Sequence, residues 1–446
     1  MAAQNIFLTF VGGSPLRKVD YRWEDEVSNS RYFQVTALEW MRRGVIPFRP
    51  NEVWVVLTER ARENWVKPPE EGEATLHDQL YTQAERMGIA IREVGFDQEP
   101  RDQSVWRNFD TLVGMLAQAS ERGADVHMAV DVTHSFRYFP MLVLTLLHYT
   151  HVIQGIQLDL ILYGADTGDV LDLTALAQLQ EWVLEMSRAL KGPDASGVER
   201  LVREIQSAVA RTSPTQASFL SPLQKFASKW NVLWETMRLT KHHEVSCAAR
   251  GALDALDACQ RRFAEPAEGT ASFYPLLRIL HQAREQIEPL CQTEWVPLML
   301  AMVRWYLDRG MIHQAYTTMR ELYATHACEL AGVDVFNDKV REQLLRWAHG
   351  KAQQSKSNAP QAPPQDDVKL EGVAEDRWNA ACAFLERFSG DISAISSLRN
   401  QLNHGFFQSG VQKTPEQTFR TAIAAPMDRL LEFMQAREET ADEQGS

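Results

Sequence analysis

The seven residues from Asp131 to Arg137 read Asp-Val-Thr-His-Ser-Phe-Arg and combine carboxylate, hydroxyl, imidazole and guanidinium groups in one short stretch. They follow an apolar run and precede a second apolar stretch, 138–153, that predicts a helix. The first backbone N–H groups of a helix are unpaired and carry partial positive charge, so this junction suits an anion. Thr133 and Ser135 could cap the helix or donate hydroxyls, and Arg137 offers a planar fork for phosphate. We therefore predict a phosphate-ligand site at the carboxyl end of a strand.

A second loop, Gly12-Gly13-Ser14-Pro15, follows the first apolar run of the chain. It lacks the spacing of a dinucleotide-binding fingerprint, and no helix is predicted directly after it. Two interpretations stay open: a plain turn, or a loop whose glycines let backbone approach a ligand. Because it leaves a strand end as the Thr133 loop does, Gly12, Gly13 and Ser14 are candidate ligand-binding residues.

The segment Arg399-Asn400-Gln401-Leu402-Asn403-His404 carries an arginine and a histidine five residues apart. His404 can act as a general acid or base near neutral pH, and Arg399 can stabilise charge that develops on a phosphate. Asn400 could orient either side chain, and Gly405 suits a helix C-cap that would leave His404 at an exposed helix end. By spacing alone, a surface arginine and a capping histidine is the favoured interpretation.

The same arginine–histidine spacing occurs three more times in the chain, so the spacing alone decides nothing. One of these pairs spans a predicted helix-to-strand turn, one lacks a polar residue after the arginine, and one separates the side chains around a helix. They are Arg122/His127, Arg238/His243 and Arg320/His326. The context therefore favours Arg399, Asn400 and His404 as the catalytic candidates.

Residues 1–190 alternate short apolar strands with amphipathic helices, which predicts a parallel, Rossmann-like α/β sheet covered on both faces. The predicted strands are Ile6–Val11, Glu52–Thr58, Ile89–Val94, Val126–Val132, Leu158–Gly164 and a short Val170–Leu173. The predicted helices are Ser28–Arg43, Leu76–Met87, Val105–Arg122 and Tyr138–Ile153.

After Lys191-Gly192-Pro193, a helix-breaking sequence, strand patterns fade and residues 191–437 predict an all-helical domain. The expected helices are 199–210, 224–238, 246–263, 275–287, 295–309, 311–330, 340–349, 376–388 and 418–437. The proline-rich segment 351–372 predicts a disordered insertion, and residues 438–446 predict a frayed acidic tail.

The composition limits the classes of partner. A formal net charge of −13 over 446 residues opposes a large DNA-binding surface, and no apolar run is long enough for a membrane span. Five scattered cysteines fit a reducing, cytoplasmic setting, so we expect neither a disulfide framework nor a zinc site. His242-His243-Glu244 is more simply a solvated helix face than a metal site, because adjacent helical side chains point apart.

Two resemblances coincide on these motifs. The sheet domain with Asp131–Arg137 after its fourth strand resembles the CARF domain of CRISPR-associated proteins, whose motif is Asp-x-Thr-His-Gly-x-Arg. The helical domain with Arg399–His404 resembles a HEPN ribonuclease domain. The segment from Tyr306 through Glu321 is similar to one branch of that family. In this order, the two domains resemble the ancillary ribonucleases of type III CRISPR systems.

The resemblance implies a homodimer that binds a cyclic oligoadenylate activator across its CARF domains. Thr133, His134 and Arg137 match the contacting motif, Ser14 is a further contact, and Ser135 stands where the family has glycine. That replacement leaves the ring size open, although cyclic tetra-adenylate is the commonest activator in the family.

For the helical domain, the resemblance implies a composite cleft with one Arg399/His404 pair from each subunit. The enzyme would cleave single-stranded RNA without a metal or cofactor. The RNA 2′-hydroxyl would be the nucleophile, and the products would carry 2′,3′-cyclic phosphate and 5′-hydroxyl ends.

Two alternatives remain open from the sequence. In the first, the protein is a non-enzymatic sensor whose helical half only binds a partner. In the second, the CARF domain cleaves its own cyclic activator and so ends the signal, either alongside the ribonuclease activity or instead of it.

Overall fold

A computed structural model describes residues 3–13, 16–97, 101–121, 125–135, 138–212, 214–264, 274–354, 373–403 and 415–444. The chain divides into two compact units, Met1–Glu181 and Trp182–Ser446. Helix α6 (Thr174–Lys191) contains the division, whereas the sequence placed the boundary after residue 190. A continuous helix conceals such a boundary, because the helical pattern does not change where the packing partners do.

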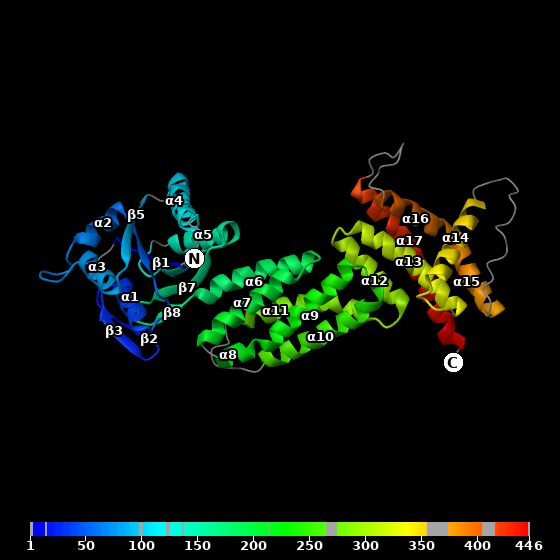
Figure 1. Ribbon diagram of the computed structural model, residues 1–446, viewed down its shortest axis with the longest axis horizontal. Helices are drawn as coiled ribbons and strands as arrows, with labels where there is room; N and C mark the ends of the chain where they lie inside the picture. The colour runs from blue at the N-terminus through cyan, green and yellow to red at the C-terminus, as the bar shows by residue number, and fades with distance from the viewer. Residues whose placement is uncertain are drawn as a thin grey trace. The chain divides into compact units, whose positions relative to one another are not determined.

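The first unit contains a six-stranded sheet in the order β5-β4-β1-β6-β7-β8 (Figure 1). Five strands pair in parallel, and β8 joins the edge antiparallel to β7. The strands are β1 Gln4–Phe10, β4 Glu52–Thr58, β5 Ala90–Phe96, β6 Val126–Asp131, β7 Gln157–Gly164 and β8 Val170–Asp172. The predicted α/β sheet is therefore confirmed, with an antiparallel edge strand.

Helices cover both faces of this sheet because successive side chains of β1 point to opposite sides. Leu8 and its neighbours on one face pack against α4 (Asp102–Ser120) and α5 (Phe139–Gln154). Phe7, on the other face, joins the core that contains α1 (Phe33–Arg43) and α3 (Leu76–Met87). Both strand faces are buried, as a parallel sheet requires.

The helix predicted from Ser28 was wrong in its first turn. Val19–Trp23 (β2) and Glu26–Ser30 (β3) form a separate two-stranded antiparallel hairpin, and the helix begins only at Phe33. Strand β2 does alternate Val19, Tyr21 and Trp23 with charged residues, but it is only five residues long and β3 has a single apolar residue, so the hairpin was missed; Tyr21 is the one fully buried residue among its strands. Helix α2 (Glu59–Val66) was also not predicted.

The second unit is all-helical in its described ranges, as predicted. Its helices after α6 are α7 Ser196–Thr212, α8 Pro214–Phe219, α9 Ser221–Arg238, α10 His242–Ala264, α11 Tyr274–Ile287, α12 Trp295–Asp308, α13 Ile312–Ala331, α14 Asp338–Gln354, α15 Glu375–Arg387, α16 Ser389–Asn403 and α17 Glu416–Gln444, with a 3₁₀ turn at Glu288–Cys291. Helix α13 is central: Tyr316 and Tyr323 are fully buried, and the helix packs against α12, α15 and α16.

Two expectations about irregular segments differ from the helix bounds. Helix α14 extends to Gln354, so residues 351–354 of the expected insertion are helical, while 355–372 lie outside the described residues. Helix α17 continues to Gln444, through most of the segment expected to be a frayed tail. Among the described residues, the model contains no helix with the length and apolarity needed to cross a membrane.

Candidate functional site

The strand order reverses between β1 and β6, which are neighbours at the centre of the sheet. Strands β4 and β5 are added on one side of β1, and β7 and β8 on the far side of β6. Open α/β sheets bind ligands at the carboxyl ends of the strands at such a reversal. The Gly12 loop follows β1 and the Thr133 loop follows β6, so the topology brings two sequence-predicted loops together.

The two loops are close enough to touch. A Cβ atom built on Gly12 would lie 3.3 Å from the backbone oxygen of His134 and 3.6 Å from the His134 Cβ. That separation is tight for a side chain but suits glycine, so the backbones approach one another here. This contact supports the interpretation of Gly12 as a close-approach residue rather than as part of a plain turn.

A buried carboxylate ties β1 to β6 beneath the loops. The Thr9 hydroxyl donates to Asp131 Oδ2 at 2.7 Å, and the Thr133 backbone N–H donates to Asp131 Oδ1 at 2.9 Å. The pKa of Asp131 is raised, because the effect of burial is larger than the opposing effects of His134 and of the hydrogen bonds from Thr133 and Thr9. Asp131 is fully buried, so we assign it the role of fixing the start of the Thr133 loop.

Neither loop hydroxyl caps the following helix, which was one of the two roles expected for them. The Gly164 N–H donates to Thr133 Oγ1 at 2.8 Å, and Ser135 Oγ donates to the Val132 backbone oxygen at 2.8 Å. Helix α5 begins at Phe139 with no side-chain cap. Proline near its first position favours that later start, because proline has no N–H to satisfy.

His134 is half-buried in the loop between the two strands. Burial lowers the pKa of its imidazole, although the nearby carboxylates of Asp131 and Asp166 oppose this shift. Its Nε2 atom is buried and has no hydrogen-bond partner within the described part of the chain. A neutral imidazole can donate or accept a hydrogen bond, depending on its tautomer, so this nitrogen could bind a polar atom of a ligand.

Two polar side chains from α2, neither predicted from the sequence, reach the Gly12 loop. Asn64 Nδ2 donates to the Gly12 backbone oxygen at 3.0 Å. A Cβ on Gly13 would lie 3.2 Å from Cδ of the exposed Arg60. Helix α2 starts at the carboxyl end of β4, so the rule applied to β1 and β6 would have found Arg60 if the helix had been recognised.

A cavity of about 180 Å³ opens beside Gly12, between β1 and the segment after α2. Its polar lining includes Asn64, Lys67 and Arg31, and Arg31 is held by the Leu16 backbone oxygen at 2.9 Å and by Glu70 and Glu73. Two prolines and aliphatic side chains complete the wall: Pro68, Pro69, Val11, Leu16 and Leu76. The lining therefore combines cationic and apolar groups, which suits a ligand with both phosphate and ring parts.

In the helical unit, Arg399 and Asn400 lie on the last turns of α16. The Nε atom of Arg399 is buried and has no hydrogen-bond partner among the described residues, whereas Asn400 is exposed. The predicted residues His404, Ser14 and Arg137 lie outside the described residues.

His313, at the start of α13, contacts the end of α16 and was not predicted as a site residue. Its Nε2 atom is within hydrogen-bond distance of Asn403 Oδ1. The two residues are 90 positions apart in the chain. No spacing pattern could have joined them, because only the packing of α13 against α16 brings them together.

The alternative pair Arg320/His326 has structural partners. Arg320 forms ion pairs with Glu321 and Glu342, at 2.6 and 2.9 Å. His326 is buried, contacts Glu329 at 3.1 Å and packs edge-on against Phe384. Both side chains therefore already have partners on or beside α13, whereas the Arg399 Nε has none among the described residues.

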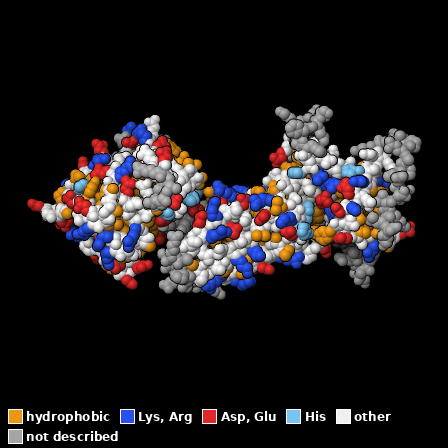
Figure 2. Space-filling model, in the orientation of Figure 1, with side chains coloured by type: hydrophobic (Ala, Val, Ile, Leu, Met, Phe, Trp, Pro, Cys, Tyr) orange, Lys and Arg blue, Asp and Glu red, His pale blue; other side chains and the backbone are white. Residues whose placement is uncertain are grey.

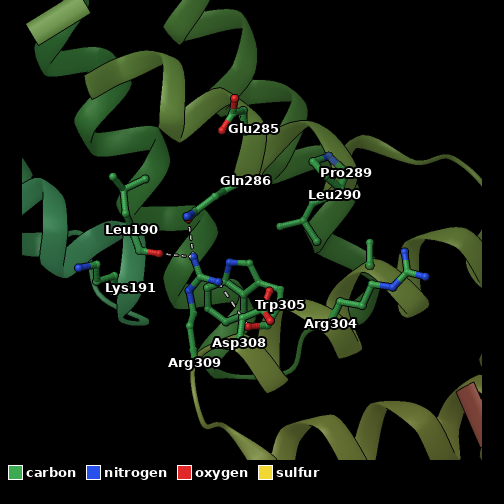
Figure 3. Close-up of a pocket in the computed structure, with 11 residues that line it drawn as sticks. Leu190, Lys191, Glu285, Gln286, Pro289, Leu290, Arg304, Trp305, Asp308 and Arg309 are labelled. Carbon is green, nitrogen blue, oxygen red and sulfur yellow. Dashed lines mark hydrogen bonds between the residues drawn. The ribbon is translucent and has the colours of Figure 1, made fainter. Parts of the chain in front are cut away.

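Arg309 is one of the residues that line a cavity of about 460 Å³ in the helical unit (Figure 3). Arg309 donates to the backbone oxygens of Leu190 at 2.8 Å and Gly192 at 3.0 Å, and to the Gln286 side chain. Its guanidinium carbon lies 4.1 Å from the centre of the Trp305 ring, and burial lowers the Arg309 pKa to about 10. Arg309 therefore fixes the end of α12.

Basic and acidic side chains are intermixed on the face of the protein shown in Figure 2. Within the described ranges, no group of three or more histidine, cysteine, aspartate or glutamate side chains is placed to hold a metal ion.

No model of a known protein family matches the chain. A stretch of 103 residues is 25% identical to CRISPR-associated protein MJ1674 of Methanocaldococcus jannaschii. This match covers 22% of the chain and about 15% of the length of that relative. Among solved structures, the chain is similar to Enterococcus italicus Csm6 bound to cyclic hexa-2′-fluoro-hexa-dAMP, with 11% identity. That match covers 96% of the chain and 94% of the other, with a TM-score of 0.39.

Proposed function

We propose that this protein is a cyclic-oligoadenylate-activated, metal-independent endoribonuclease that cuts single-stranded RNA in type III CRISPR antiviral defence. The sensor motif at Asp131–Arg137 and the Arg399–His404 motif support this function together, in the order typical of such enzymes. The 103-residue similarity to a CRISPR-associated protein supports the same association.

The observation that carries the sensor role is the position of the Gly12 and Thr133 loops at the strand-order reversal. The activator would contact Gly12, Gly13 and Ser14 on one side and the Thr133 loop on the other. His134 would supply the imidazole nitrogen that has no partner among the described residues, and Thr133, Ser135 and Arg137 of the same motif are proposed as further contacts. We add Arg60 as a phosphate-binding candidate, because it is exposed beside Gly13.

A homodimer is supported by an apolar stripe on α5, the helix that directly follows the Thr133 loop. Met141, Tyr149 and Val152 recur at helical spacing on this helix and are 74, 43 and 54% exposed. Exposed apolar patches of this kind commonly mark protein interfaces. A second copy of the chain packed on this stripe would bring two activator loops into one site.

In the proposed reaction, His404 and Arg399 from two subunits form one cleft around the RNA. A base removes the proton from a 2′-hydroxyl, and the oxygen attacks the adjacent phosphorus. The bond from phosphorus to the 5′-oxygen breaks, and an acid protonates that oxygen. Arg399 stabilises the charge on the phosphate oxygens, and Asn400 orients a neighbouring group. The products carry 2′,3′-cyclic phosphate and 5′-hydroxyl ends.

The activator is proposed to be cyclic tetra-adenylate, with three- and six-membered rings as the next candidates. Ser135 carries a hydroxyl that already bonds within the loop, so it constrains the loop that would surround the ring. Direct binding measurements with the three ring sizes distinguish them.

The test of the proposed function separates its two sites. His404→Ala should abolish RNA cleavage and leave binding of cyclic tetra-adenylate unchanged. His134→Ala should weaken that binding at least about tenfold, since a buried polar contact to the ligand is lost. His281→Ala, at an exposed position of α11, is the matched control for both. Retained cleavage in His404→Ala would remove this histidine from the active site.

A further inference from the structure

His313 is placed beside the candidate catalytic helix by contacts that neither motif predicts. It is the second residue of α13, and its Nε2 contacts Asn403 Oδ1 at the last residue of α16. His404 is the next residue along the chain. A bond at Asn403 therefore acts directly on the backbone that leads into the predicted catalytic histidine.

The contact lies on the same side of α16 as the candidate arginine. Arg399 and Asn403 are four residues apart, so their side chains lie one above the other on one helix face. Asn400, three positions before Asn403, is exposed and is also a neighbour of Asn403 on the helix surface. His313 therefore contacts α16 beside both Asn400 and Arg399, whose Nε has no hydrogen-bond partner among the described residues.

The start of α13 is held firmly enough for His313 to fix a neighbour. The Met311 N–H donates to the Tyr306 oxygen at 2.9 Å, and Gly310 closes the turn with a φ of 69°. One turn into α13, the hydroxyl of the buried Tyr316 donates to the Phe419 oxygen at 2.8 Å. A side chain can position a partner only if its own backbone is fixed, and these bonds fix it.

We propose that His313 is a positioning residue of the ribonuclease site. The imidazole donates from Nε2 to Asn403 and so holds the end of α16, the helix that carries Arg399 and that directly precedes His404 in the sequence. This inference rests on the proposed function. Supporting residues that orient reactive groups typically contribute about 10–100-fold to activity.

The first test compares two substitutions of His313 in the full-length protein with cyclic tetra-adenylate. His313→Ala should lower kcat about 10–100-fold with little change in the KM for RNA, because the chemistry is misaligned while RNA binding is retained. His313→Gln should restore most of the activity, since its amide nitrogen can replace Nε2 as the donor. The shape of the pH–rate profile should not change in either variant.

Two outcomes would overturn the inference. If His313→Gln is as inactive as His313→Ala and one limb of the pH profile is lost, His313 transfers protons itself. If His313→Ala cleaves RNA as the wild type does, the contact has no positioning role.

The second test needs neither activator nor RNA, so it separates this inference from the proposed function. Amide hydrogen exchange over residues 399–403 should be faster in His313→Ala and close to wild type in His313→Gln, with His281→Ala as control. Unchanged exchange in His313→Ala would overturn the inference even in a protein that cleaves RNA. Failure of the wild type to cleave RNA would overturn the proposed function alone.

Discussion

At the scale of single residues, the Gly12 and Thr133 loops are held together by the strands that lead into them. His134 lies against Gly12 because the two strands that precede these residues pair in register. Their bonding was harder to predict. Thr133 accepts from Gly164, and Gly164 is a neighbour only through β7. Arg60 and His313 were missed for the same reason, since each reaches its site from an element distant in sequence.

Burial of single histidines makes a testable statement about acid stability. His242 Nε2 is 3.0 Å from the hydroxyl of the fully buried Thr318, and burial lowers the His242 pKa to about 4. In the unfolded chain, His242 binds a proton below a pH of about 6.5, whereas in the folded protein it stays neutral until about pH 4. The contribution of His242 to stability is therefore fully present above pH 6.5 and is lost as the pH falls towards 4. The loss from this residue is up to about 3 kcal/mol.

His242→Gln should therefore reduce the loss of unfolding free energy between pH 7 and 4.5 relative to the wild type. Urea unfolding followed by tryptophan fluorescence at both pH values measures the difference. His281→Gln, on the exposed face of α11, is the control. Equal losses in wild type and His242→Gln would show that His242 is not held neutral.

At the scale of elements, periodicity predicted the sheet and most helices but not the β2–β3 hairpin. This hairpin is stabilised by the turn between β7 and β8 as well as by the packing of Tyr21 in the core. The Arg22 N–H donates to the Gly168 oxygen at 2.7 Å, and its guanidinium bonds to Thr167 and Asp169. These partners belong to a turn that is distant in sequence, so no local pattern could indicate them.

Gly168→Ala should destabilise the first unit by roughly 2–3 kcal/mol. Gly168 has a φ of 91°, and an added Cβ would clash with the Asp20 oxygen of β2. Gly88→Ala is the matched control, because Gly88 also has a positive φ, 68°, but no atom lies within 4 Å of the added Cβ. It should cost about 1 kcal/mol. If both variants lose the same unfolding free energy in urea, the close approach of Gly168 to β2 does not add to the cost of the substitution.

At the scale of the whole molecule, the sequence predicted two units of different class, an α/β sheet followed by helices. The helical unit was predictable as a class but not as a site. Arg320 and Arg309 form ion pairs or hydrogen bonds, whereas the Arg399 Nε has no partner among the described residues, and this difference is a property of packing rather than of spacing.

Dimer formation through α5 predicts a linked loss of assembly and activation. Met141→Asp with Val152→Asp should yield a monomer in sedimentation equilibrium and abolish activator-dependent cleavage, because charge on both partners' stripes opposes burial. Val27→Asp, at an exposed position of β3, is the control and should leave the dimer intact. A dimer that persists in the double variant would place the interface elsewhere.

The most direct measurement is cleavage of a fluorescent single-stranded RNA reporter by the full-length protein in EDTA, with and without cyclic tetra-adenylate. We predict cleavage only when the activator is present, unaffected by EDTA, with 2′,3′-cyclic phosphate ends on the products. Binding of three-, four- or six-membered rings without any cleavage would contradict the account and identify the protein as a non-enzymatic sensor.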